Sequence, residues 1–469
     1  MTTVAISASD SEAFAPTQNG LTADVVPRWS AGSRIAFRFF FLLTLLYSIV
    51  TLGVEVVYRL PFALRLGVWW SSTVIEPIWS PVVRWIARNV LRVTISGPVS
   101  AQWVGLFCVA MLSALGTLGW TIVDRRRLQY HSLYDWLRVY CRFAAAVLLM
   151  SYGLEKVLIT QADFPPAPSA LLKPLGSFDP ASFFFAYLAA SPVYQAFAGS
   201  VELLAGILLI PRRTTAIGAL LAVGAMANVL VVNWAFDIRM YRISLSTFII
   251  AVFLLLPDLP RLANVLVLNR TVLPAKARWL FDAPRLNKLA QILGVCFLIG
   301  EIAFLLRRDM TEGMHWRGRP PLYGAYVVQD FVRSGARATP PATDDGRWTQ
   351  LAVDSKPTGN VMPADAFGVI VRPRDTMQVM IRVDTAHRVV TFMQGKQTSQ
   401  WTYTTPDTNH LVLTGVDHFR RAGMSLAVQS PSRAVARDTA NSTASGASDS
   451  LRVTLRRLDL MAFRLFRGK

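Results

Sequence analysis

The sequence predicts an α-helical integral membrane protein of about seven transmembrane helices, followed by an all-β antiparallel sandwich or small barrel. Three observations support this fold class. Of the 469 residues, 53% are hydrophobic and only 16% are charged, whereas soluble domains carry about 25% charged residues. Apolar runs of about 20 residues, long enough to cross a bilayer, recur up to residue 306. Beyond residue 313 the apolar runs shrink and alternate with polar residues at the period of a β-strand.

We expect the chain to divide into three parts. Residues 1–33 are rich in Ser, Thr, Ala and Asp and lack the features of a signal peptide, so they predict a disordered cytoplasmic tail. Residues 34–312 form the transmembrane domain. Its seven predicted spans lie at 39–57, 104–123, 139–159, 193–210, 214–236, 243–256 and 289–306. The sixth span is short and stops at Pro257.

The long connection at 59–98 interleaves arginine with tryptophan. That mixture suits interfacial helices lying in the headgroup plane, and a re-entrant pair is the alternative. Orientation follows from arginine clusters after the second, fourth and sixth spans, which all lie on one side if seven spans are correct. This side is predicted to be cytoplasmic. The N-terminus is then inside, in a bacterial inner membrane, and the C-terminal domain is periplasmic. The five arginines of 59–98 conflict with this, but a long loop obeys the rule poorly.

Residues 313–469 are predicted to form the extracytoplasmic β domain. An antiparallel meander is the simplest topology because no helical pattern separates the strands. Residues 430–450 are rich in Ser, Ala and Thr and predict a flexible loop. The expected strands lie at 323–332, 347–353, 366–372, 376–383, 388–394, 410–416, 424–429 and 451–458.

Charge and composition exclude several classes of function. The net charge of +19 is mostly arginine. We interpret it as a topology signal and an attraction to anionic membrane lipids, not to nucleic acid, because no basic helix stands apart from the spans. The three cysteines lie in or beside apolar spans without a CxxC pair, which argues against a disulfide framework. The five histidines lie outside the predicted spans and lack ligand spacing, so there is no haem or metal signature.

Polar side chains occur within the third to sixth spans, where lipid disfavours them. Ionisable groups inside a membrane segment suggest a site by default, and the predicted topology gathers most of them in the outer half of the bilayer. One interpretation is a ligand-binding or proton-handling site. The other is a set of charges that only pair with each other, with Glu202 held by Lys156 or an outer arginine. The candidate residues are Tyr152, Glu155, Lys156, Glu202, Asn228, Asn233, Asp237, Arg239 and Arg242, with Glu301 in the seventh span.

One helical stripe combines small and polar residues. Gln195, Gly199, Glu202 and Gly206 follow the 4-3-4 spacing of a single helix face. The glycines would let a neighbouring helix approach closely. A carboxylate within such a stripe needs a partner or takes up a proton.

An ordered set of segments between about 124 and 270 resembles the DoxX-like membrane proteins. The segments are DRRRLQYHSLYDWLRVYCRF, YGLEKV, DFPP, SPVYQAFAG, VELLAG, PRRTTAIGALL, NVLVVNWAFD and LPDLPRL. The resemblance implies a four-helix core over 133–272. Because some relatives are linked to quinone-dependent sulfur oxidation or redox stress, it also implies quinone as a possible cofactor. The matching positions are Tyr152, Gly153, Lys156, Pro165, Pro166, Glu202, Arg212, Arg213, Asn228, Asn233 and Asp237. In the family pattern the aspartate precedes proline and lysine, whereas Arg239 and Arg242 follow it here.

These observations lead to one main hypothesis and two alternatives. The main hypothesis is that the helices bind a quinone or lipid in an outer-leaflet polar pocket centred on Lys156 and Glu202, with a redox-linked role. The first alternative is a non-enzymatic membrane anchor or assembly protein whose periplasmic β domain binds a protein partner. The second is a transporter, suggested by the short sixth span. No G-x-S-x-G, H-E-x-x-H, P-loop or G-x-G-x-x-G motif identifies a reaction.

Overall fold

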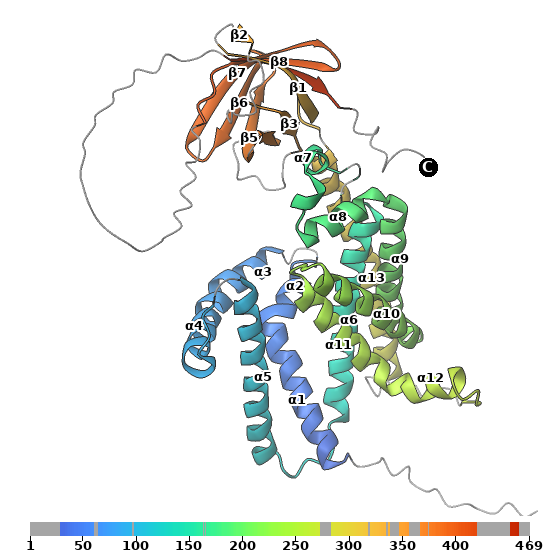
Figure 1. Ribbon diagram of the computed structural model, residues 1–469. Coiled ribbons are helices and arrows are strands. Elements are labelled where there is room, and N and C mark those ends of the chain that lie inside the picture. The colour runs from blue at the N-terminus through green and yellow to red at the C-terminus, as the bar shows by residue number, and fades with distance from the viewer. Residues whose placement is uncertain are drawn as a thin grey trace, which may run out of the picture.

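A computed structural model places a helical region beneath a β-barrel (Figure 1). It describes residues 29–458 except 61–63, 96–97, 163, 165, 273–282, 318, 334–335, 338–346, 356–365, 374 and 420–450. The predicted tail lies outside the described residues up to residue 28, and residues 31–33 belong to the first helix. The helices are α1 Ala31–Tyr47, α2 Gly53–Val57, α3 Leu64–Trp69, α4 Glu76–Ile86, α5 Pro98–Val123, α6 His131–Val157, α7 Pro168–Leu172, α8 Pro180–Ala190, α9 Pro192–Leu209, α10 Thr215–Ala235, α11 Tyr241–Leu255, α12 Leu259–Leu266 and α13 Pro284–Arg317.

The prediction of seven spans is confirmed. Among the described residues, seven helices are long and apolar enough to cross a membrane, and each overlaps a predicted span. The sixth helix, α11, ends at Leu255, one residue from its predicted end before Pro257. Pro257 lies in the 3₁₀ turn that follows, Leu256–Asp258, and the separate helix α12 extends the apolar stretch to Leu266. The transporter alternative stays a prediction.

Four helices form the centre of the membrane region. Helix α6 packs on α9, α9 on α10, α10 on α11, and α11 on α6 again. Helix α6 is the most enclosed of the spans. Of its most apolar 18-residue stretch 67% is buried, against 11% of the corresponding stretch of α13. These four helices correspond to the expected core over 133–272. Alanine and leucine fill the interior around Ala145, Leu149 and Leu209.

The remaining helices flank this core. Helix α1 packs along α5. Between them, residues 64–91 form a nearly continuous bent helix in which π-helical turns at Trp70–Ile75 and Ala87–Leu91 flank α4. One face of α4 packs against α5 through Val83 and Ile86, while Ile78 and Trp85 are exposed. An exposed apolar face of this kind suits contact with lipid.

The C-terminal domain is a closed antiparallel barrel. Strands β1 and β3 to β9 pair in sequence order, and β9 pairs back onto β1. This closure resolves the expected choice between sandwich and barrel. Trp348, Trp401 and Phe392 are completely buried in the barrel interior. The strands are β1 Gly324–Arg333, β2 Ala336–Arg337, β3 Gln350–Val353, β4 Ala366–Val371, β5 Thr376–Asp384, β6 Val389–Gln394, β7 Gln397–Asp407, β8 His410–Gly415 and β9 Leu451–Arg457.

Two details of the β prediction need comment. Strand β7 was not predicted, because Gln, Ser and Thr hide its alternation. Ser399, Trp401 and Tyr403 nevertheless point inward, with exposed residues between them. The expected strand at 424–429 and the loop at 430–450 lie outside the described residues.

The barrel rests on the connection between the third and fourth spans. The backbone N–H of Ser169 in α7 donates to Asp354 Oδ1 beside β3, at 2.9 Å. Burial raises the pKa of the Asp354 carboxyl, and the hydrogen bonds from Ser169 oppose that rise. Four spans separate α7 from the barrel, and an even number returns the chain to the same side of the membrane. The contact therefore agrees with the seven-span count.

Candidate functional site

Lys156 and Glu202 meet where α6 and α9 approach most closely. A Cβ atom built on Gly199 would lie 2.5 Å from the carbonyl oxygen of Gly153, and one built on Gly153 would lie 2.6 Å from the Leu203 nitrogen. Only glycine permits this approach. The Lys156 Nζ then reaches Glu202 Oε2 at 2.7 Å, and the two side chains are 12% and 3% exposed. The predicted small-residue stripe is confirmed as a packing surface, and its carboxylate has the partner that it needed.

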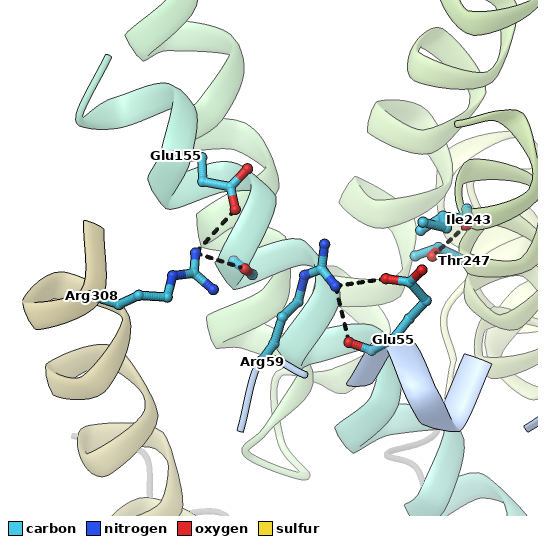
Figure 2. A network of polar contacts seen from close by, with 7 residues as sticks. Glu55, Arg59, Glu155, Ile243, Thr247 and Arg308 are labelled. Carbon is cyan, nitrogen blue, oxygen red and sulfur yellow. Dashed lines mark hydrogen bonds and ion pairs between the residues drawn. The ribbon is translucent and has the colours of Figure 1, made fainter. Parts of the chain in front are cut away.

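Glu155 and Tyr152 take part in two further charge contacts, and Figure 2 shows the arginines involved, Arg308 and Arg59, with their carboxylate partners. Arg308 reaches from α13 to Glu155 Oε1 at 3.0 Å and to Ser151 Oγ at 3.3 Å. Arg59, just after α2, pairs with Glu55 at 2.8 Å. Its guanidinium lies 4.4 Å from the centre of the Tyr152 ring, a cation–π contact worth about 0.5–2 kcal/mol. These contacts tie α2, α6 and α13 together at the end of the bundle that faces the barrel.

The other predicted residues do not join this group. Asn233 is buried and donates to Ser244 Oγ at 3.1 Å, which links α10 to α11. Asn228, Asp237 and Arg239 are exposed. Asp237 has a φ of 50°, a left-handed conformation that aspartate adopts more readily than most residues, and it follows the end of α10. Its position has a structural explanation, and the ligand-binding role of all these residues stays a prediction.

Two buried polar side chains have no hydrogen-bond partner among the described residues. They are Gln195 in α9 and Glu301 in α13, which are 0% and 1% exposed. Glu301 lies seven residues from Gly294 and from Arg308, so the three share one helix face. That face packs toward α6 at Phe143 and Glu155.

Arg242 lines a pocket of about 220 Å³ that we call the Arg242 pocket. Its walls come from the end of α1, the π-helical turn Trp70–Ile75 with α4, the first turns of α5 and the start of α11. Apolar side chains such as Ile75 and Leu106 alternate with hydroxyl, amide and charged groups. The Arg242 Nε and the Gln102 Oε1 are buried without hydrogen-bond partners. Arg242 makes no ion pair with a described residue, so a donor and an acceptor are left unsatisfied around one cavity.

A second hollow lies on the other side of α1. It measures about 390 Å³ and is almost wholly apolar, between α1, α2, α3 and α6. Its lining includes Phe41, Trp70 and Tyr140. A volume within the range of small-molecule sites, about 300–1,000 Å³, and an apolar wall suit a hydrocarbon chain or ring.

The sequence analysis missed a polar cluster at the opposite end of α1. Arg38 is 3% exposed, and its guanidinium donates to Tyr130 Oη at 2.6 Å and to the Asp124 carbonyl at 2.8 Å. Tyr130 in turn donates to Asp124 Oδ2 at 2.9 Å, which lowers the pKa of that carboxyl. Arg38 directly precedes the apolar span predicted at 39–57. An arginine at this position was the signal in the sequence that could have indicated the cluster. The cluster is satisfied internally and locks α1 to the α5–α6 turn.

Nothing in the described part of the chain brings three His, Cys, Asp or Glu side chains together to hold a metal ion. Ion pairs at Lys156 and Glu155 join helices. Unsatisfied groups occur at the Arg242 pocket and, away from it, at Gln195 and Glu301. Pairing ions and binding an amphiphile are what this arrangement can do chemically.

The fold and these contacts define a multi-pass membrane protein with a β-barrel domain. No family model matches the chain, and no solved structure matches it. The chain is 36% identical over 109 residues to "Uncharacterized protein YwoB" of Bacillus subtilis (strain 168), a segment that covers 23% of this chain and 67% of that protein. Through this segment the chain belongs to the same family as the Bacillus protein. The resemblance to DoxX-like proteins is not addressed by this match and stays a prediction.

Proposed function

We propose that the protein binds a membrane amphiphile whose polar head lies in the Arg242 pocket. The single observation that supports this is an arginine with a buried, unsatisfied Nε in a cavity that also contains apolar side chains. Burying a donor without an acceptor costs about 1–3 kcal/mol. The Nε itself has almost no accessible surface, so a ligand recovers this free energy by drawing the guanidinium into the pocket and supplying the acceptor.

The depth of the pocket favours an amphiphile over a soluble ligand. Tyr47 lies at the end of the first span, and Gln102 and Arg242 lie in the first turns of two others. This is where apolar spans meet the headgroup region, so a polar head at this depth leaves its chains in the hydrocarbon. By the arginine distribution the pocket lies in the outer leaflet of a bacterial inner membrane, with the N-terminus cytoplasmic and the barrel periplasmic.

The proposal moves the site away from the Lys156–Glu202 pair. A charged pair at 2.7 Å that is nearly excluded from solvent satisfies itself, and opening it for a ligand would expose both charges to a low dielectric. We assign this pair to holding α6 against α9. Quinone remains a rival occupant of the Arg242 pocket, since its carbonyl oxygens also accept hydrogen bonds.

The test is native mass spectrometry of detergent-purified protein. We expect wild type to retain a bound lipid, Arg242→Gln to lose it, and Arg239→Gln to keep it. Arg239 is the matched control because it is exposed and lies outside the pocket, three residues away. Equal retention by the Arg242 and Arg239 variants would contradict the proposal, and a retained quinone would identify the rival ligand.

The anchor hypothesis has one observation of its own. Large side chains such as Trp348, Trp401 and Phe392 are buried in the barrel interior, so we expect a partner to bind through the outer surface or the ends of the barrel. We therefore retain partner binding by the barrel as the second candidate. If variants confined to the barrel surface abolish the cellular phenotype while Arg242→Gln is silent, this candidate replaces the first.

A further inference from the structure

The Arg242 pocket contains charges of both signs that do not neutralise each other. Glu76, at the first turn of α4, lines the same cavity as Arg242. Its carboxylate accepts a hydrogen bond from Ser80 Oγ at 2.8 Å, and it forms no ion pair with Arg242. The pocket therefore offers an unpaired cation and an unpaired anion at separate places on its wall.

Two neutral side chains of the pocket also favour a cationic group in the ligand. The Gln102 Oε1 is a buried acceptor without a donor, and the indole of Trp79 lines the cavity beside Glu76. A carboxylate, an amide oxygen and the face of an indole all attract an ammonium group. The Arg242 guanidinium suits a phosphate. The pocket therefore suits two ligand groups of opposite charge. One is an ammonium near Glu76 and Gln102, and the other is a phosphate near Arg242.

The size of the cavity limits what enters it. At about 220 Å³ it is smaller than the roughly 300–1,000 Å³ of sites that enclose a whole drug-sized molecule. A cavity of this size has room for a headgroup but not for acyl chains, which would stay in the bilayer.

We infer that the Arg242 pocket selects a zwitterionic phospholipid headgroup that contains both a phosphate and a primary amine, as in phosphatidylethanolamine. This inference rests on the proposed amphiphile binding and names its ligand class. Arg242 binds the phosphate, and Glu76, Gln102 and Trp79 surround the ammonium. Phosphatidylglycerol supplies hydroxyl donors for Gln102, but it has no ammonium group to balance the charge of Glu76. A quinone supplies acceptors only and leaves Glu76 and Gln102 unmatched.

The experiment is a lipid titration of delipidated full-length protein, followed by native mass spectrometry. The probes are phosphatidylethanolamine, phosphatidylglycerol and water-soluble glycerophosphoethanolamine. Because only phosphatidylethanolamine supplies a charged hydrogen-bond donor for Glu76 and Gln102, we expect it to bind at least about tenfold more tightly than phosphatidylglycerol. The soluble headgroup should bind far more weakly, because it lacks the chains.

Variants separate headgroup selection from amphiphile binding. Glu76→Gln should bring the two lipids to equal affinity while binding persists, and Arg242→Gln should weaken both. Asp237→Asn is the matched control, because this exposed carboxylate lies outside the pocket, and it should keep the preference.

Four outcomes would overturn the inference. Tighter binding of phosphatidylglycerol, or an unchanged preference in Glu76→Gln, would refute the headgroup assignment while leaving amphiphile binding intact. Equal binding of the soluble headgroup would assign the site to a soluble phosphoamine and refute the lipid source. If wild type bound no lipid at all, both the headgroup assignment and the proposed function would fail.

Discussion

Removing one member of the Lys156–Glu202 pair should destabilise the membrane domain far more than removing both. The Nζ–Oε2 distance is 2.7 Å, and the side chains are 12% and 3% exposed. Deleting one partner of a buried pair costs about 3–5 kcal/mol, because the remaining charge is left uncompensated. We expect this loss for Lys156→Met and for Glu202→Leu separately. The double variant should cost less than either, because apolar residues of similar volume replace a buried pair with little loss.

The assay is a double-mutant cycle on the free energy of unfolding in mixed detergent micelles. Glu301→Gln is the control, since that buried carboxylate has no hydrogen-bond partner among the described residues and its neutralisation breaks no ion pair. We expect a coupling energy of at least about 2 kcal/mol between Lys156 and Glu202. Additivity within about 0.5 kcal/mol would refute the conclusion that the two charges hold α6 to α9.

Three further substitutions test other parts of the structure. Gly199→Ala should cost about 1–3 kcal/mol by overpacking, because its Cβ would lie 2.5 Å from the Lys156 Cβ; unfolding in micelles measures this. Asp417→Leu should lower barrel stability by about 3–5 kcal/mol in a thermal melt, since Asp417 pairs with the buried Arg372 at 3.2 Å. Because the docked carboxyl of Asp354 has a raised pKa, docking of the barrel on α7 should be strongest below its ordinary pKa of about 4. Docking should weaken as the pH rises through the raised value, and Asp354→Asn should remove this dependence in a distance measurement between spin labels.

Matched controls accompany these substitutions. Gly224→Ala in α10 should be neutral or stabilising, because no atom lies within 4 Å of the new Cβ. Asp375→Leu, at an exposed carboxylate, should change barrel stability by no more than about 0.5 kcal/mol. Equal losses at Gly199 and Gly224, or at Asp417 and Asp375, would contradict the packing and pairing described. A pH dependence that survives in Asp354→Asn would remove Asp354 from the docking contact.

Hydropathy and strand periodicity sufficed to predict the architecture, because both follow from burial of apolar surface along one element. The Gln195–Gly206 stripe even indicated which face of α9 packs and which carboxylate needs a partner. Pro257 was correctly interpreted as the end of the sixth helix, because α11 ends at Leu255 and a 3₁₀ turn follows. The β prediction failed where tertiary context outweighs local pattern. Strand β7 is stabilised by its neighbours and by inward Trp401 despite a polar sequence.

The candidate site was less predictable than the fold. Helical spacing predicts which face of a helix a residue lies on, but not which neighbouring helix that face contacts. Glu155 and Lys156 are adjacent in sequence, yet they form ion pairs with different helices. Asn228 and Asp237 are exposed instead of facing a common cavity. The Arg242 pocket brings together residues 47, 76, 102 and 242, and no pattern within one segment encodes that meeting.

The most direct test compares bound lipid in two variants that separate the pocket from the ion pair. The account predicts that Arg242→Gln loses the lipid that wild type retains through purification. It also predicts that the double variant Lys156→Met/Glu202→Leu, which removes the charges without opening the pocket, retains it. Loss of lipid from the double variant together with retention by Arg242→Gln would contradict the account and return the ligand to the Lys156–Glu202 pair.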